Sequence, residues 1–338
     1  MNVFFGQDAQ GNAVEFGVSE SIPGITEALP FTAGTVWHVK PSSGLDTNTG
    51  LSIDQAFKTL AKALASATAN QNDIVVLHAE SNTAANTTDY QSATLDWNKD
   101  MVHLIGANNG AFVSQRSRVA LISTYVTASN LFTLSADGCL IRNISFFAGV
   151  ADANPTGCFK VTGMRNVIEK CHIAGVGNDT NDIAGAYSLL IDGGAENVFR
   201  GCAIGLDTIA RGTAANSEIL LDGSATRNLF EDCLIFRLIE HNTNAPLVKL
   251  ADATAIDRWL WFRRCMFLNL SVNFATANAG VFKLVADLTQ GYIVVEDCKA
   301  NAGKAATTIK WDVDDRDKIV LFAQALTPAD TAGIERMV

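Results

Sequence analysis

Short apolar segments recur through the middle of the chain, and turn residues separate them. Segment 159–161 is followed by Thr162-Gly163 and then by a second apolar segment, 166–169. Segments 189–191 and 219–221 begin two further copies in the same order. Runs of β-branched and aromatic residues that end in Gly, Asp or Asn predict strands, and no helical periodicity lies between them. This region is therefore expected to consist of short strands and tight turns.

The cysteines give the period of this pattern. Five of them follow one another at spacings of 31, 31, 32 and 33 residues: Cys171, Cys202, Cys233, Cys265 and Cys298. An earlier copy, 131–144, aligns so that Ile144 takes the same position, which leaves Cys139 and Cys158 outside the column. A fixed period of this length is typical of a solenoid. We predict an all-β fold, a right-handed single-stranded parallel β-helix with an N-terminal capping helix.

Residues one period apart would stack in such a coil, because each rung hydrogen-bonds to the rung below at a distance of about 4.8 Å. The cysteines would then form an internal column of small apolar side chains at a crowded bend. A zinc site would need ligands at C-x₂₋₄-C spacing, and the sequence has no such pair. We expect neither a metal site nor a cofactor.

A column of charged residues lies two positions before the cysteine column. Its sign alternates at all six rungs: Arg142, Glu169, Arg200, Glu231, Arg263 and Glu296. If these residues stack, each charge has opposite charges above and below it. A slipped rung would bring like charges together, so the alternation favours one register. This predicts a structural role for three of the carboxylates.

The segment before the repeats has a different pattern. A strand at 36–39 precedes a loop with four small or polar positions at every second residue: Gly44, Asp46, Asn48 and Gly50. Ser52 and Gln55 form a capping-box pattern, and Phe57, Leu60 and Leu64 would share one face of a helix. A strand at 73–77 follows. We predict a plug over the open end of the β-helix, which would protect exposed strand edges.

This segment resembles the pectate-lyase-like β-helix superfamily, notably its bacteriophage virion members. The resemblance lies in the G-x-D-x-N-x-G loop, in the A-F-K-T-L sequence at 56–60 and in Asp73-Ile74-Val75-Val76. It covers residues 36–300 as an architecture and residues 36–80 as a motif. It implies a pectin-lyase-like β-helix and a homotrimer. It leaves function open, because lyases, hydrolases and inert phage spikes share this fold.

Three regions follow from these patterns. Residues 1–35 would form an N-terminal arm that docks onto a subunit or another virion protein, or else a hairpin folded back on the plug. Residues 36–300 would form the β-helix, with its capping segment at 36–80. Residues 301–338 would form a C-terminal cap or arm, with one strand-like piece at 318–322.

Composition narrows the possible partners. Charged residues make up 18% of the 338 residues, and the net charge is −10. An acidic surface repels phosphates, so we expect no nucleic-acid partner. The sequence has neither an apolar run long enough for a membrane span nor the N-terminal pattern of a signal peptide. We expect a protein made in the host cytoplasm that contacts no membrane.

Candidate chemistry is sparse. Asp192 and Asp222 occupy matching turns one rung apart, and a glycosidase pair needs two carboxyl groups about 5–9.5 Å apart. Each of them precedes a glycine, however, and Asp-Gly is a common turn dipeptide. A loop at 175–182 contains Asp179 and Asp182, which would either hold a cation or lie in solvent. The histidines are scattered, and His172 is expected to point into solvent.

The sequence therefore favours a bacteriophage virion structural protein, such as a capsid decoration, head fibre or spike subunit. Its partners would be copies of itself in a homotrimer, other virion proteins such as the major capsid protein, and host surface glycans. One alternative is a polysaccharide lyase or glycoside hydrolase of tailspike type, in which Asp192 and Asp222 would be catalytic. Another is a non-catalytic glycan-binding module.

Overall fold

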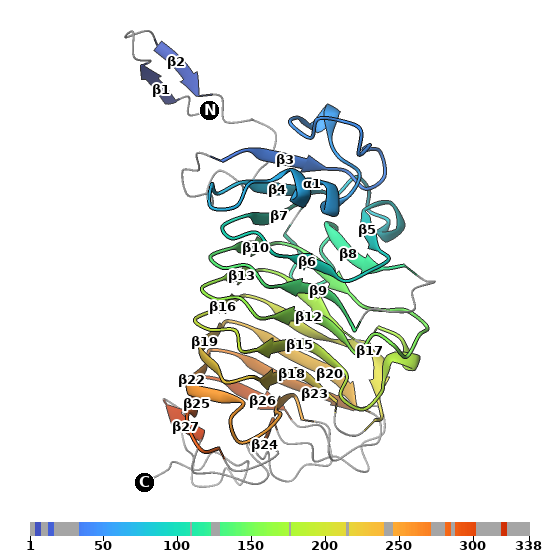
Figure 1. The fold of residues 1–338 in the computed structure, drawn as a ribbon. Coiled ribbons are helices and arrows are strands. Elements are labelled where there is room, and N and C mark those ends of the chain that lie inside the picture. The colour runs from blue at the N-terminus through green and yellow to red at the C-terminus, as the bar shows by residue number, and fades with distance from the viewer. Residues whose placement is uncertain are drawn as a thin grey trace.

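Parallel strands stack rung upon rung into one elongated coil (Figure 1). The computed structural model describes residues 4–7, 13–16, 34–108, 110–122, 129–175, 177–213, 216–239, 246–271, 281–284, 288–301 and 319–322. Within these residues, every pair of neighbouring strands from β3 onward is parallel. The prediction of a right-handed parallel β-helix is confirmed.

Three sheets form the walls of the coil, and the chain visits them in the same order in successive rungs. The first sheet contains β3 (Val36–Val39), β4 (Ile74–His78), β7 (His103–Ala107), β10 (Leu140–Arg142), β13 (Val167–Glu169), β16 (Val198–Arg200), β19 (Ala225–Glu231), β22 (Ile256–Arg263), β25 (Tyr292–Glu296) and β27 (Ile319–Phe322). The second sheet contains β5 (Thr88–Gln91), β8 (Arg118–Leu121), β11 (Ser145–Phe147), β14 (His172–Ala174), β17 (Ala203–Arg211), β20 (Leu234–Ile239), β23 (Met266–Ser271) and β26 (Lys299–Asn301). The third sheet contains β6 (Leu95–Trp97), β9 (Asn130–Leu134), β12 (Gly157–Val161), β15 (Tyr187–Asp192), β18 (Ser217–Asp222), β21 (Val248–Leu250) and β24 (Phe282–Leu284).

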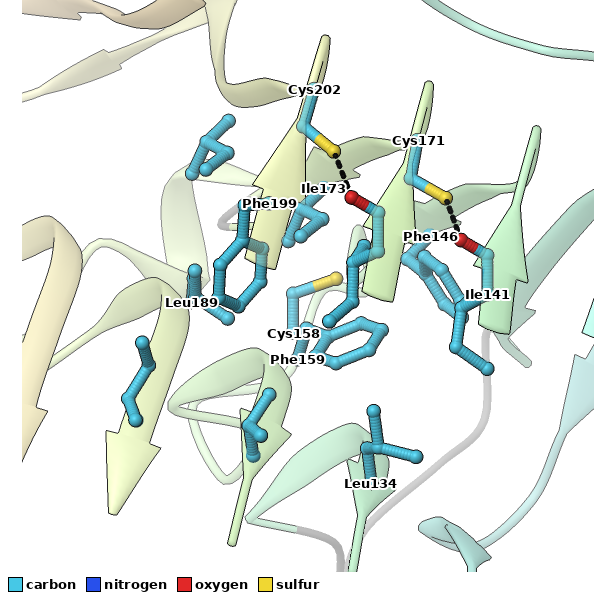
Figure 2. Close-up of a cluster of buried hydrophobic side chains, with 14 of the residues drawn as sticks. Leu134, Ile141, Phe146, Cys158, Phe159, Cys171, Ile173, Leu189, Phe199 and Cys202 are labelled. Carbon is cyan, nitrogen blue, oxygen red and sulfur yellow. Dashed lines mark hydrogen bonds between the residues drawn. The ribbon is translucent and has the colours of Figure 1, made fainter. Parts of the chain in front are cut away.

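The corner between the first and second sheets explains the cysteine column. One residue with φ between 50° and 59° makes this corner in six rungs: Asn143, Lys170, Gly201, Asp232, Arg264 and Asp297. The next residue points into the core, and it is Ile144 in the first of these rungs and a cysteine in the other five. Each of these five thiols donates to a carbonyl of the preceding rung at 3.3–3.6 Å, and Figure 2 shows this for Cys171 and Cys202.

The corner between the third and first sheets contains a second column, which was not predicted from the sequence. Asn166, Asn197 and Asn228 are buried at intervals of 31 residues. The side-chain oxygen of Asn197 accepts from the backbone N–H of Asn166 at 2.9 Å, and its amide donates to the carbonyl of Gly163 at 3.1 Å. These bonds satisfy backbone groups that the turn removes from the strand ladders. The column therefore fixes the shape of this corner.

The core consists of stacked like residues. The rings of Phe199, Phe230 and Phe262 lie 4.6 and 4.8 Å apart on successive strands of the first sheet. All seven cysteines are buried, and their sulfurs are not joined in disulfide bonds. Burial raises the pKa of the Cys171 and Cys233 thiols. These observations place the cysteines in hydrophobic packing.

The plug differs from its prediction in one respect. The expected single helix from Ser52 to Leu64 is two elements, the 3₁₀ turn η1 (Ile53–Gln55) and α1 (Leu60–Ser66). Asp46 explains the break, because its carboxylate accepts from the backbone N–H groups of Lys58 and Thr59 and from the Thr59 hydroxyl at 2.9–3.0 Å. These bonds hold the connecting residues in an extended conformation.

Phe57 therefore does not share a helical face with Leu60 and Leu64. It forms an isolated parallel β-bridge with Val39 and packs into the core beside Trp37, with ring centroids 5.8 Å apart. Gly50 has a φ of +74°, and a Cβ there would lie 2.2 Å from the Phe57 ring. The spaced glycine, aspartate and asparagine positions of the loop thus hold the Phe57 ring in place over the end of the coil.

Two further 3₁₀ turns, η2 (Ala84–Asn86) and η3 (Asp179–Asn181), lie in loops between sheets. Near the N-terminus, β1 (Phe4–Gln7) pairs antiparallel with β2 (Ala13–Phe16). Residues 1–3, 8–12 and 17–33 of the predicted arm lie outside the described residues, so its docking role stays a prediction. The strand expected at 318–322 corresponds to β27, which pairs with β25 and extends the first sheet. No helix among the described residues is long and apolar enough to cross a membrane.

Candidate functional site

The outer face of the first sheet carries the alternating charges. Strand register places Arg142 beside Glu169, Glu169 beside Arg200, and so on through Arg263 and Glu296. Ion pairs join four of these five steps, with N–O distances of 3.7, 2.8, 3.5 and 3.8 Å. Glu231 also binds Arg264 at 2.9 Å. Hydrogen bonding to Arg200 and Arg264 lowers the pKa of the Glu231 carboxyl.

A second charged row lies at the corner between the third and first sheets, and it was not predicted from the sequence. Arg165, Glu196, Arg227 and Arg258 have φ values of 52–69° and occupy corresponding turns. Glu196 binds Arg165 at 2.7 Å and Arg227 at 2.6 Å. The signal was present in the sequence, because these four charged residues are spaced 31 residues apart. The outer face of the first sheet is therefore bordered by charge on both sides.

The two candidate catalytic aspartates do lie on adjacent rungs. Asp192 and Asp222 are register partners at the ends of β15 and β18. Asp192 forms a 2.7 Å ion pair with Lys160, while Asp222 accepts from the backbone N–H of Gly223 at 2.8 Å. Gly193 and Gly223 have φ values of +72° and +65°. Both aspartates thus make the contacts expected of turn residues and a surface ion pair.

A polar cluster fills the corner between the second and third sheets. Arg211 and Glu218 form an ion pair at 3.1 Å, and both side chains are fully buried. The Ser188 hydroxyl donates to Glu218. Arg237 donates to Asn269 at 3.1 Å, and burial lowers the pKa of Arg237 to about 10. Because these groups have no contact with solvent, they stabilise the corner and do not form an open reaction site.

The cation alternative for the loop at 175–182 is not supported by its bonding. Asp182 accepts from the backbone N–H groups of Gly212 and Thr213 at 2.7 and 2.9 Å and from the amide of Asn216. Asp179 is the first residue of η3. Among the described residues no group of three or more His, Cys, Asp and Glu side chains is arranged to hold a metal ion. The Asp182 carboxylate is thus bound by groups of the loop one rung later.

The histidines are not all isolated surface residues. His172 is 2% exposed, contrary to expectation, because a loop covers it: the backbone N–H of Ser114 donates to its Nδ1 at 3.1 Å. His38 and His78 lie side by side in the plug, with Nδ1 and Nε2 2.9 Å apart. Burial lowers the pKa of His78 to about 4. Among the residues that the structure describes, neither arrangement has a nucleophile or an acid within bonding distance of the ring nitrogens.

Comparison with known proteins supports the fold. No family model matches the chain, and no curated protein matches it. A pectin methylesterase solved in complex with a hexasaccharide has a TM-score of 0.53 at 14% identity, covering 88% of this chain and 94% of that chain. The pectin methylesterase from Aspergillus niger has a TM-score of 0.53 at 12% identity, covering 91% of this chain and 95% of that chain. At such identities the likeness shows the parallel β-helix fold alone.

Proposed function

We propose that this protein is a non-catalytic structural subunit, a bacteriophage virion component such as a capsid decoration, head fibre or spike subunit. The observation that carries the proposal is the engagement of Asp192 and Asp222. Glycoside hydrolysis needs one carboxyl group to protonate the leaving group and a second to attack or to activate water. Here the first aspartate is bound to Lys160 and the second to its own turn.

The proposed location in the virion rests on the resemblance of the plug segment to bacteriophage virion proteins of the β-helix superfamily. The plug closes one end of the coil. It does so through its loop, through the bonds of Asp46 to the residues before α1, and through the packing of Phe57 against Gly50. A coil with a closed end and ladders of paired charges is a rigid rod, which suits a building block. Its partners would be two further copies of the chain in a homotrimer, and other virion proteins such as the major capsid protein.

Two measurements test this proposal. Light scattering of the purified protein should give the mass of three chains. Peptide mass spectrometry of purified virus particles from the source should detect the chain at a fixed copy number per particle. A monomer that is absent from washed particles would exclude the virion role.

The second candidate is a protein that cleaves or binds polysaccharide on the outer face of the third sheet. The in-register aspartates favour it, since Leu190 and Leu220 lie partly exposed next to them on the same strands. The solved pectin methylesterases share the fold, and the pectin in their name is a polysaccharide. The two candidates therefore differ in whether the protein cleaves or binds polysaccharide at this face.

Incubation with pectin and with bacterial capsule polysaccharides, followed by assay of new reducing ends and unsaturated products, separates them. We expect no product from the structural subunit. Product that disappears in Asp192→Asn, but persists in the control Asp54→Asn at an exposed plug position, would establish the enzyme. Binding of host surface glycans without product would instead identify a glycan-binding module.

A further inference from the structure

Two neighbouring strands of the second sheet, β20 and β23, have apolar side chains on their outer face. Ile235 and Phe267 point into the core, and side chains alternate along a strand, so the residues on either side of them point outward. The outward residues form three register pairs: Leu234 with Met266, Phe236 with Leu268, and Leu238 with Leu270. Met266 and Leu270 are 42% and 38% exposed, and Leu234, Leu238 and Leu268 are partly exposed.

Both faces of this part of the sheet are therefore apolar. The two strands read Leu-Ile-Phe-Arg-Leu-Ile and Met-Phe-Leu-Asn-Leu-Ser, and their polar residues Arg237 and Asn269 are buried. Parallel strands with nearly continuous apolar sequence usually belong to sheets that are covered on both faces. Met266 and Leu270 nevertheless face solvent, which leaves the outer face of these strands open in the single chain.

The uncharged surface continues toward the plug. His172 on β14 and Ala203 on β17 occupy the same outward column as Leu234, and Gly205 is the register partner of Phe236. The Phe236 ring stacks on the His172 ring, with centroids 6.0 Å apart. Burial lowers the pKa of His172, so this side chain is neutral at pH 7. The nearest charged residues are at the two ends of the surface, where Asp207 and Lys299 are exposed.

The size and shape of this surface favour a protein partner. Each outward position covers two residue rises by one strand spacing, about 32 Å², so the nine positions from His172 to Leu270 cover about 300 Å². Apolar patches of about 300–600 Å² on single chains are often interaction sites. Small-molecule sites are concave, whereas register-paired strands form a flat surface, and a net charge of −10 disfavours nucleic acid.

We infer that a second copy of this chain covers this face, so that β20 and β23 lie at the centre of the subunit interface. The inference rests on the self-association in the proposed function and names the surface that performs it. Two copies that each carry a charge of −10 repel one another, so they meet most easily where neither is charged. Interfaces between permanently associated copies are also more apolar than those with transient partners.

The other two faces of the coil are less suited to this contact. The first sheet carries the charge ladder that contains Glu231 on its outer face, and the third sheet carries Lys160 and Lys249. In a homotrimer, the second sheets of three copies would face a shared axis and enclose Met266 and Leu270 in one apolar core. A stable interface buries about 800 Å² per partner, including a polar rim around such a core.

Sedimentation of the full-length protein tests this assignment. Met266→Glu with Leu270→Glu should weaken self-association by about a hundredfold or more, because each interface would then bring like charges together. Met164→Glu is the matched control, since Met164 is 39% exposed but lies in the turn between β12 and β13. We expect this control to keep the wild-type mass. Circular dichroism of all variants should match the wild type, because the substituted side chains are exposed.

A cross-linking pair gives a second measurement that does not depend on weakening the interface. All seven native cysteines are buried, so a cysteine introduced at an exposed position is the accessible thiol. Met266→Cys should join two chains through a short bismaleimide, which forms one thioether bond with each thiol. Met164→Cys should remain a single chain on a denaturing gel under the same conditions.

The outcomes separate this inference from the proposed function. A wild-type protein that sediments as a single chain at micromolar concentration would overturn both the inference and the homotrimer. A wild-type trimer that keeps its mass in the Glu double variant, or that dissociates equally in Met164→Glu, would overturn the inference and leave the homotrimer standing. Dissociation in the double variant alone, for a chain that is absent from washed virus particles, would support the inference and exclude the virion role.

Discussion

Glu231 is the residue of the charge ladder whose removal should have the largest effect. Its carboxylate lies 2.8 Å from Arg200, 3.5 Å from Arg263 and 2.9 Å from Arg264, and its side chain is 12% exposed. The three arginines are 40–49% exposed, so solvent screens each pair. Exposed pairs contribute about 0–1 kcal/mol each. Glu231→Gln should therefore lower the free energy of unfolding by about 1–3 kcal/mol, since three partners lose a charge at once.

The pH dependence gives this prediction a sign. Hydrogen bonding to Arg200 lowers the pKa of Glu231 in the folded state. The unfolded chain therefore binds the proton more readily, so the stabilisation is complete above the unfolded pKa of about 4.3 and is lost as the pH falls through the folded value. The difference between wild type and Glu231→Gln should be present at pH 7 and should shrink below about pH 4. Urea unfolding monitored by circular dichroism at both pH values measures it.

Glu296→Gln is the matched control in the same ladder. Within the described part of the chain, its carboxylate has one arginine partner, Arg263, at 3.8 Å. We expect a loss of under about 0.5 kcal/mol. Equal losses for the two substitutions, or a Glu231→Gln effect that persists unchanged at 1 M salt, where the Debye length is about 3 Å, would refute the assignment of a three-arginine network.

Three further predictions concern single positions. Asn197→Ala should lower the free energy of unfolding by about 2–5 kcal/mol, because two buried backbone groups lose their partners, whereas exposed Asn98→Ala should change it by less than about 0.5 kcal/mol in the same urea titration. Burial raises the pKa of Asp89 to about 6. The folded state therefore binds its proton between about pH 4 and pH 6 and loses stability across that window as pH rises, so Asp89→Asn should stabilise by about 2 kcal/mol at pH 7 and by nothing at pH 4 in urea unfolding. Gly50→Ala should lower the melting temperature more than Gly110→Ala does, because both glycines have positive φ but only the first Cβ would meet a ring.

Sequence period was sufficient to predict the coil. Once residues about 31 apart were aligned, the positions of Ile144 and Cys171 in one column followed, as did the neighbouring positions of Arg200 and Glu231. This works because a parallel β-helix converts sequence separation directly into vertical distance. The buried asparagine column obeyed the same rule, and it was missed because asparagine is also a common surface turn residue.

Contacts that do not follow the repeat of about 31 residues could not be predicted from the sequence. The break in the expected helix near Phe57 depends on Asp46. Its carboxylate lies in the preceding loop and binds backbone groups 12 and 13 residues later. His172 is covered by Ser114, 58 residues earlier in the chain. Arg211 on β17 and Glu218 on β18 form a fully buried pair. No local sequence pattern distinguishes such a pair from an exposed one.

The distribution of charge bears on where this molecule can interact. At several left-handed corners the sequence places arginines and acids that pair with each other, such as Arg165 with Glu196 and Arg264 with Asp232. Long charged side chains cover apolar surface with their stems while their ends stay in water. The rows that contain Glu231 and Glu196 therefore cover part of the apolar surface between them, where Val198 and Leu229 are partly exposed. Because these charges already bind one another, a partner that used them would have to replace ion pairs that the folded chain has formed.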